Sequence, residues 1–207
     1  MAITLYSTTY CPYAWRTRIV LHEKKVPFKV FEVDLKQKQG EFIDVSPTGK
    51  VPVFVDDGTT LWESMVVNEY LEETHPEPNL LGVAPAEKAE VRTEIIDLNW
   101  NRSQPLAKLA AMFLYGRLEK DNERIERQLG RWNGYLNFLD QIFSTRLWLA
   151  IGRFSMADIS LYTTVSISHG FGLGQDKERP ALATWMDRMN DRDAVRRSAP
   201  AGLPELH

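Results

Sequence analysis

The single cysteine of the chain stands at a position suited to a nucleophile. Cys11 follows a β-prone run that ends at Ser7, and it precedes Pro12. Proline is favoured at the first position of a helix because the N–H it lacks would have no partner there. Cys11 is therefore predicted to lie at a helix N-terminus, where backbone N–H groups and the helix dipole lower a thiol pKa and favour nucleophilic attack. The alternative is a small buried hydrophobic residue, a common role for a lone cysteine.

Two further segments place polar backbone groups where a ligand could use them. Pro52 falls within a strand-like run, so Val51-Pro52 is either part of an edge strand or a cis peptide bond. A cis bond, which we predict, would turn the backbone of Val51 toward an extended peptide. Glu63-Ser64 opens a predicted helix whose N–H groups and hydroxyl suit a carboxylate, unless Ser64 is an ordinary cap.

The elements that must position these residues alternate between strand and helix in the first part of the chain. In the first helix, Trp15, Ile19 and Val20 recur at helical spacing, and Arg16 and Arg18 are predicted on other faces. An Asp57-Gly58 pair indicates a tight hairpin. The predicted order is βαβαββα, with a strand over 2–7, a helix over 13–24, a strand over 28–34, a helix over 40–45, strands over 51–56 and 59–61, and a helix over 63–74.

Helical periodicity replaces this alternation after a stretch that contains Pro76, Pro78 and Pro85. The fold class is therefore an α/β domain plus an all-α helical bundle, with expected limits of 1–76, a linker over 77–86, and 87–207. Ser155 and Asp158 form a predicted capping box in front of an apolar run. The helices are expected over 86–117, 122–144, 156–170 and 180–190.

Composition excludes several classes of protein. The 207 residues include 43% hydrophobic and 26% charged residues, which is typical of a globular chain. A formal net charge of −3 gives no general attraction to nucleic acid, and we interpret the basic cluster Arg192, Arg196 and Arg197 as a solvated face. No apolar run is long enough to span a membrane, and no secretory signal is evident. One cysteine permits neither an intramolecular disulfide nor a cysteine-based metal site, which favours a reducing cytoplasm.

Residues 1–75 resemble the thioredoxin-like N-terminal domain of the cytosolic glutathione transferases. The resemblance extends more weakly through the helical part, at Ser155-Met156-Ala157-Asp158. Cys11-Pro12-Tyr13 is similar to the cysteine-containing, omega-like group, which includes lambda-class enzymes and dehydroascorbate reductases. Ala14-Trp15-Arg16 instead resembles the zeta class, whose serine at the position of Cys11 supports isomerisation and conjugation. The motifs that carry the resemblance are Cys11-Pro12-Tyr13 with Arg16, the run 47–53, Glu63-Ser64 and Tyr70-Leu71.

The resemblance implies glutathione as the cosubstrate, no metal, and a role for each matching residue. Cys11 matches the nucleophile, and Tyr6 lies near where other classes keep a catalytic tyrosine, although a core role is the alternative. Lys38 matches the cation for the glycyl carboxylate, Val51 the backbone partner of the cysteinyl part, and Glu63 and Ser64 the γ-glutamyl site. The expected glutathione-binding set is Lys38, Lys50, Val51, Pro52, Glu63 and Ser64. The candidates for a second-substrate pocket, whose aromatic members could instead be core, are Pro12, Tyr13, Asn99, Trp100, Gln104 and Phe113.

The function expected from these residues is glutathione-dependent thiol transfer. The Cys11 thiolate would attack a glutathione mixed disulfide or reduce a small oxidant, and a second glutathione would release it. One alternative is a zeta-like conjugating or isomerising transferase, in which the thiol of bound glutathione attacks. The other is a non-catalytic interaction protein of the stringent-starvation type.

The resemblance also implies a two-fold homodimer, with no nucleic-acid or membrane partner. We expect the helix after the hairpin to face the first long helix of a second copy. The residues expected on this surface are Trp62, Met65, Val66 and Glu69 on one side, and Glu90, Val91 and Glu94 on the other.

Overall fold

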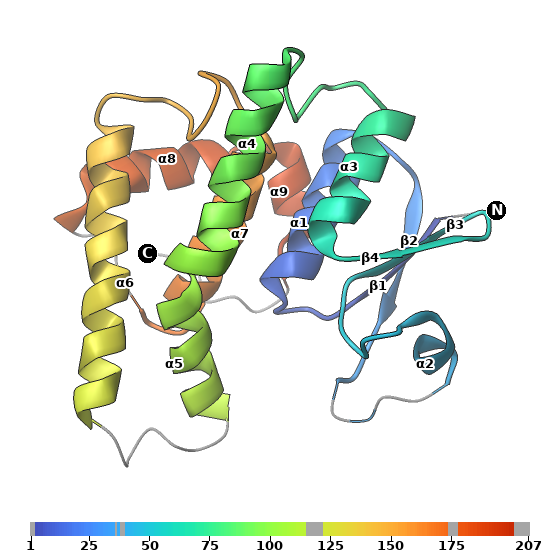
Figure 1. Ribbon diagram of the computed structural model, residues 1–207, viewed down its shortest axis with the longest axis horizontal. Coiled ribbons are helices and arrows are strands. Elements are labelled where there is room, and N and C mark those ends of the chain that lie inside the picture. Colours follow the sequence, from blue (N-terminus) through green and yellow to red (C-terminus); the bar gives the residue numbers. More distant parts are fainter. Residues whose placement is uncertain (1–2, 36, 38–39, 115–121, 174–177, 201–207) are drawn as a thin grey trace. The chain divides into compact units, whose positions relative to one another are not determined.

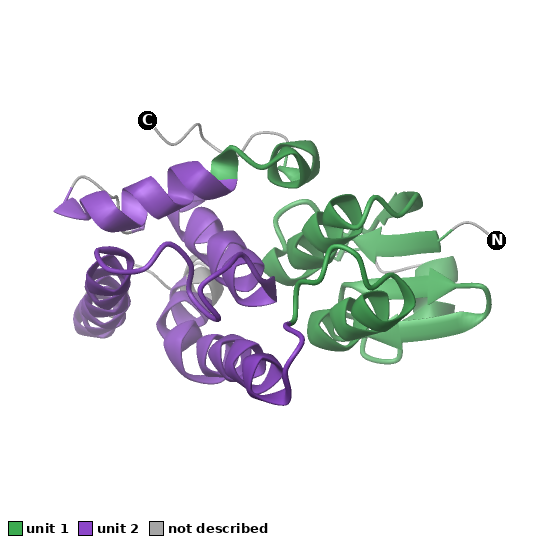
Figure 2. Ribbon diagram, turned by 90° about the horizontal axis from the view of Figure 1, so that it is seen from above, with its two compact units in different colours: residues 1–81, 190–205 green, residues 82–189, 206–207 purple. Residues whose placement is uncertain are grey.

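The computed structural model describes residues 3–35, 37, 40–114, 122–173 and 178–200. They form two compact units, which Figure 2 shows in different colours. One unit comprises Met1–Leu81 together with the segment that begins at Asn190, and the other comprises Gly82–Met189. The predicted combination of an α/β domain and an all-helical domain is confirmed.

The first unit is built on a four-stranded mixed sheet. Its order is β2-β1-β3-β4, in which β1 pairs in parallel with β2, and the other two pairings are antiparallel. The hairpin turns at Asp57 and Gly58, both of which have positive φ, as a two-residue turn of type I′ requires. The strands are β1 (Ile3–Ser7), β2 (Phe28–Glu32), β3 (Val53–Asp56) and β4 (Thr59–Trp62).

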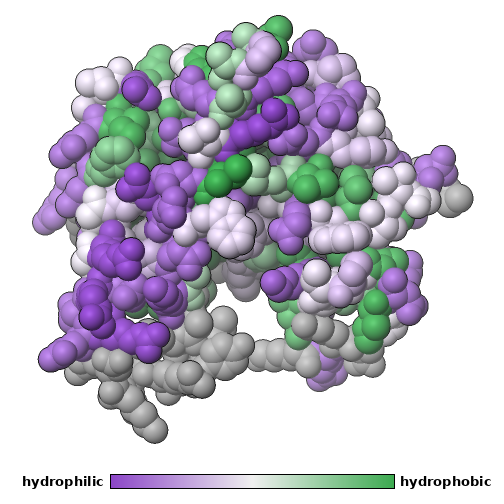
Figure 3. Space-filling view, in the orientation of Figure 1, coloured by the Kyte–Doolittle hydropathy of each residue, from purple (hydrophilic) through white to green (hydrophobic). Residues whose placement is uncertain are grey.

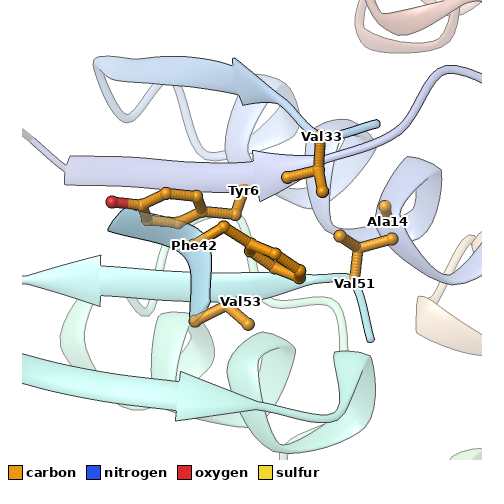
Figure 4. Packing of buried hydrophobic residues seen from close by; sticks show 6 residues of the cluster. All are labelled: Tyr6, Ala14, Val33, Phe42, Val51 and Val53. Carbon is orange, nitrogen blue, oxygen red and sulfur yellow. The ribbon is translucent and has the colours of Figure 1, made fainter. Parts of the chain in front are cut away.

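Three helices cover the two faces of this sheet. Figure 1 shows α1 (Pro12–Glu23) and α3 (Ser64–Thr74) on one side and the short α2 (Glu41–Val45) on the other. The core on the α2 side is a cluster of buried apolar side chains against which Cys11 packs. Figure 4 shows this cluster, which consists of Tyr6, Ala14, Val33, Phe42, Val51 and Val53.

The last described helix, α9 (Asp193–Ser198), packs on α1 within the first unit. Trp15 donates from Nε1 to Ser198 Oγ at 3.0 Å, and Arg192 makes a two-pronged ion pair with Glu23 at 2.7 and 2.9 Å. The helical domain expected over 87–207 therefore needs correction, because the segment that begins at Asn190 belongs to the first unit. Of the basic cluster expected to be a solvated face, Arg196 and Arg197 are exposed as predicted, whereas Arg192 is paired with Glu23.

The second unit is all-helical over its described residues. The single helix expected over 86–117 is divided, and the bond from Ser103 N to Leu98 O at 2.9 Å closes a π-type turn at the break. Pro105 explains the division, since it has no N–H to continue an α-helical ladder. The helices are α4 (Pro85–Asp97), η1 (Leu98–Arg102), α5 (Gln104–Leu114), α6 (Asn122–Phe143), α7 (Met156–Gly170) and α8 (Pro180–Asn190).

The exposed faces mix polar and apolar residues. On the face drawn in Figure 3, apolar side chains form small groups among polar ones. In the described part of the chain, every helix is too short or too polar to cross a membrane.

The predicted capping box of α7 is confirmed, and it forms a fully buried hydrogen-bond network. Asp158 accepts from Ser155 N and Oγ at 3.1 Å through one carboxylate oxygen. Its other oxygen accepts from Leu149 N at 2.9 Å and Trp185 Nε1 at 3.2 Å. Burial raises the pKa of Asp158 to about 6, and these four donors oppose that shift.

We expect Asp158→Asn to lower the free energy of unfolding by about 3 kcal/mol, because an amide NH2 would face two buried donors and leave them without an acceptor. Urea unfolding at pH 7 measures this, with the exposed Asp187→Asn as the control. A loss below about 1 kcal/mol, the value of one ordinary hydrogen bond, would contradict the network as described.

Candidate active site

Three chain segments meet at one end of the sheet in the first unit. Val53, the first residue of β3, lies opposite Tyr6 near the end of β1 and opposite Trp62 at the end of β4. Because both pairings are antiparallel, the segments after β1, before β3 and after β4 all lie at this end. These segments carry Cys11, Val51-Pro52 and Glu63-Ser64, respectively.

Cys11 is the residue before α1, at the N-cap position that the sequence predicted. Its half-buried thiol points at the backbone of Val51, and Sγ donates to Val51 O at 3.9 Å. The backbone N–H groups of Tyr13 and Ala14 hydrogen-bond the sulfur and favour its thiolate form. The thiol and the backbone that the sequence paired with it are therefore adjacent.

The predicted lowering of the Cys11 pKa is wrong in direction. Burial raises the pKa of the Cys11 thiol, and it outweighs the two N–H groups and the nearby Arg16 and Arg18 guanidinium groups, all of which lower it. The helix terminus was correctly located. The cost of removing a thiolate from water depends on packing, which the sequence pattern did not reveal.

Alkylation of Cys11 by iodoacetamide is accordingly expected to speed up with pH and to reach its midpoint above about 8.5, the pKa of a free thiol. The reason is that only the thiolate reacts, and burial keeps the thiol protonated at neutral pH. Because Cys11 is the only cysteine, the rate can be followed by the mass of the intact protein, with Cys11→Ser as a blank. A midpoint below about 7.5 would show that the donors and cations prevail over burial.

The two cations beside the thiol were missed as site residues. Arg16 and Arg18 were predicted only on faces of the first helix other than the apolar one, and they are 2% and 7% exposed. Arg16 lies over the ring of Tyr13, with Cζ 4.7 Å from its centroid, and burial lowers the pKa of Arg16 to about 10. A signal was present, since Arg18 follows Cys11 by seven residues, about two helical turns on the same face.

Val51 and Pro52 are buried next to Cys11, and their peptide bond is cis, as predicted. Lys50 is exposed. Lys38, the expected partner of a glycyl carboxylate, falls outside the described residues.

The start of α3 presents an uncapped helix N-terminus. Glu63 is the N-cap, makes no side-chain cap hydrogen bond, and has a φ of +67°, an uncommon value for a residue other than glycine. Ser64 is the first helical residue and is 4% exposed. A carboxylate placed here would meet the positive end of the α3 dipole.

Tyr6 belongs to the core and not to the reactive edge. Its hydroxyl donates to Glu41 Oε1 at 2.7 Å, and its ring packs on Phe42. Burial and Glu41 raise the pKa of Tyr6 to about 12, which leaves it protonated. The core alternative considered from the sequence therefore describes Tyr6.

The candidates for a second-substrate pocket lie in both units. Pro12 and Tyr13 flank the thiol, and Tyr13 is 39% exposed. Asn99 and Trp100 lie in the π-type turn η1, where Trp100 is 73% exposed. Gln104 begins α5, which also includes Phe113, whose side chain lies outside the described residues.

The fold and this edge define a class of protein. A βαβαββα unit with a thiol at the start of its first helix and a backbone segment beside it is followed by an all-helical unit. Among the described residues, no group of three or more His, Cys, Asp and Glu side chains could hold a metal ion.

Comparisons with known proteins agree with this architecture. Residues 10–74 match the glutathione S-transferase N-terminal domain, and residues 103–193 match the glutathione S-transferase C-terminal domain. The chain is 33% identical to maleylacetoacetate isomerase of Rattus norvegicus over 174 residues, 81% of this chain and 78% of the relative. It is therefore a member of the glutathione S-transferase family.

Two further relatives cover nearly the whole chain. FtsZ-localized protein A of Caulobacter vibrioides is 28% identical over 93% of this chain and 89% of its own. The crystal structure of a glutathione S-transferase from Methylobacillus flagellatus with glutathione bound superposes with a TM-score of 0.84, at 28% identity over 96% of this chain and 100% of that chain.

Proposed function

We propose that this glutathione S-transferase catalyses thiol transfer through Cys11, with glutathione as the cosubstrate. The observation that carries the proposal is the position of the thiol, at the N-terminus of α1 and 3.9 Å from the carbonyl oxygen of Val51. A hydroxyl there would suffice as a hydrogen-bond donor, whereas a sulfur can also form a disulfide. A lone reactive thiol of this kind suits a reducing cytoplasm.

The reaction proceeds in two exchanges. The Cys11 thiol first loses its proton to solvent, and the thiolate then attacks the glutathionyl sulfur of a mixed disulfide, so that a new Cys11–glutathione disulfide forms and the old S–S bond breaks. The leaving thiolate takes a proton from solvent. The thiolate of a second glutathione then attacks the glutathionyl sulfur on Cys11, releasing oxidised glutathione and the Cys11 thiolate, so no second protein thiol is required.

Glutathione binding in this proposal uses the edge of the sheet beside the thiol. Val51, whose carbonyl lies beside Cys11, offers its backbone to the extended cysteinyl part, with Pro52 as its neighbour. Glu63 supplies a carboxylate for the ammonium of the γ-glutamyl group, and Ser64 at the start of α3 receives its carboxylate. Lys50 and Lys38 remain proposed cations for the glycyl end, and Pro12 and Tyr13 are proposed contacts for the second substrate, with Asn99, Trp100, Gln104 and Phe113 as further candidates.

The test traps the first exchange. Wild-type protein is mixed with the disulfide of glutathione and 2-mercaptoethanol, quenched in acid and analysed by intact mass and peptide mapping. We expect the mass to rise by one glutathionyl group at Cys11, and added glutathione to remove that group and restore the original mass. Turnover without any adduct at Cys11 would contradict the proposal.

A conjugating or isomerising transferase is the second candidate, and one observation favours it. Because burial raises the pKa of Cys11, the side chain is mainly S–H at neutral pH and could donate a hydrogen bond to the thiolate of bound glutathione. The similarity to maleylacetoacetate isomerase is in keeping with this reaction. Conjugation of a halo-aromatic that survives Cys11→Ser would select this candidate.

A non-catalytic interaction protein is the remaining alternative. Failure to bind glutathione in calorimetry, together with failure to turn over either type of substrate, would select it.

The two-fold homodimer stays a proposal, with a corrected surface. Val66 and Trp62 are 51% and 41% exposed, as contact residues would be in a free subunit, whereas Val91 is fully buried within the second unit and cannot contact a second copy. We expect wild type to show twice the 23.8 kDa chain mass in light scattering and Val66→Asp to show the single mass. Val83→Asp, at a site 75% exposed, is the control. If Val66→Asp is still a dimer in light scattering, the proposed contact surface is wrong.

A further inference from the structure

The guanidinium group of Arg18 is buried against the turn that leads into α1. Its Nη1 donates to Ser7 Oγ at 2.5 Å and to Thr8 O at 3.5 Å, and its Nη2 donates to Thr9 O at 3.1 Å. The residue is 7% exposed. A planar guanidinium with several fixed donors holds its acceptors in one arrangement, which a single ammonium group cannot do.

The acceptors of Arg18 belong to the turn that sets the position of Cys11. The backbone N–H of Cys11 donates to Thr8 O at 3.2 Å, so this carbonyl serves both Arg18 and Cys11. Glu32, in β2, holds the same turn from another element, since its Oε1 accepts from the N and Oγ1 of Thr9, each at 2.6 Å. The turn is therefore hydrogen-bonded both to Arg18 in α1 and to Glu32 in β2.

We propose that Arg18 is a positioning residue for Cys11: by binding the carbonyl groups of Thr8 and Thr9, it fixes the turn before α1 and keeps the thiol beside the backbone of Val51. This inference rests on the proposed thiol transfer and adds Arg18 as the residue that orients the nucleophile Cys11. Displacing a reacting atom by about 1 Å can cost about 100-fold in rate, so a loosened turn has a large effect on transfer.

The test distinguishes the role of Arg18 in positioning the Cys11 thiol from the effect of its positive charge. Arg18→Lys keeps the positive charge and loses the fork that spans two carbonyls. We expect the kcat/KM for transfer from the mixed disulfide to fall at least about tenfold, because sulfur-to-sulfur attack needs a defined geometry. Alkylation by iodoacetamide, a small reagent that approaches from many directions, should stay within threefold of wild type, as should the Kd for glutathione.

Two further variants complete the experiment. Arg192→Lys changes another arginine fork, which lies before α9 and binds Glu23 at the last residue of α1, away from the turn, and it should leave transfer unchanged. Ser7→Ala removes one acceptor of Arg18 and should slow transfer two- to fivefold. If Arg18→Lys does not fold, the rate of Ser7→Ala serves as the test of the positioning role.

Either of two results overturns the inference. One is transfer within twofold of wild type in folded Arg18→Lys, or in Ser7→Ala when Arg18→Lys does not fold. The other is an equal loss of transfer and alkylation. If Cys11→Ser transfers at the wild-type rate, the proposed function is wrong instead. The Arg18 variants retain Cys11, so they cannot produce that result.

Discussion

Cys11→Ser is expected to lower the kcat/KM for transfer from a glutathione mixed disulfide by at least about 10³-fold, the scale of loss when a covalent nucleophile is removed. A serine hydroxyl can neither form the protein–glutathione disulfide nor ionise near neutral pH. The substitution is nearly isosteric, so the fold and the neighbouring carbonyl of Val51 should be retained. Turnover is measured by coupling oxidised glutathione to its reductase.

Tyr6→Phe is the matched control for this experiment. Its ring lies in the core and its hydroxyl donates to Glu41, so loss of the hydroxyl should cost about 1 kcal/mol of stability and leave the transfer rate unchanged. A Cys11→Ser enzyme that retains a tenth or more of wild-type turnover would assign the attacking thiol to bound glutathione and select the conjugating candidate.

Glu72→Ala is expected to lower the free energy of unfolding by about 3–5 kcal/mol, because it leaves the buried ammonium group of Lys24 without its counter-charge. Lys24 Nζ lies 2.7 Å from Glu72 Oε2, and the two side chains are 0% and 7% exposed. The other oxygen, Oε1, accepts from the N–H groups of Leu80 and Leu81 at 2.9 and 3.3 Å. One carboxylate thus joins α1, α3 and the segment after α3.

Lys24 extends this connection, since Nζ also donates to His75 O at 2.7 Å and Pro78 O at 3.0 Å. Urea unfolding measures the loss, with the exposed neighbour Glu73→Ala as a control expected within about 0.5 kcal/mol of wild type. Adding Lys24→Met to Glu72→Ala should recover part of the stability, because no buried charge is then left unpaired. A single Glu72→Ala loss below about 1 kcal/mol would show that water already screens this pair.

Local sequence was sufficient for most of the elements and for the position of the thiol. Strand alternation, helical spacing and turn residues act within a few positions of one another, so the order βαβαββα, the start of α1 at Cys11-Pro12 and the capping box at Ser155 follow from short-range physics. The cis bond before Pro52 also matched, since a proline in a strand-like run leaves few alternatives.

Tertiary packing decided what local patterns could not. The pKa of Cys11 depends on how much water the surrounding side chains exclude, and here burial outweighs the helix N-terminus that the sequence revealed. Arg16 and Arg18, which helical spacing places only on faces other than the apolar one, are both buried, Arg16 over the ring of Tyr13 and Arg18 against the turn before α1. The docking of α9 on α1 joins Arg192 to Glu23, which are 169 residues apart. Solvent exclusion and long-range pairing arise only when distant segments meet, so the sequence alone determined where the thiol lies, and the tertiary structure decided its ionisation and its neighbours.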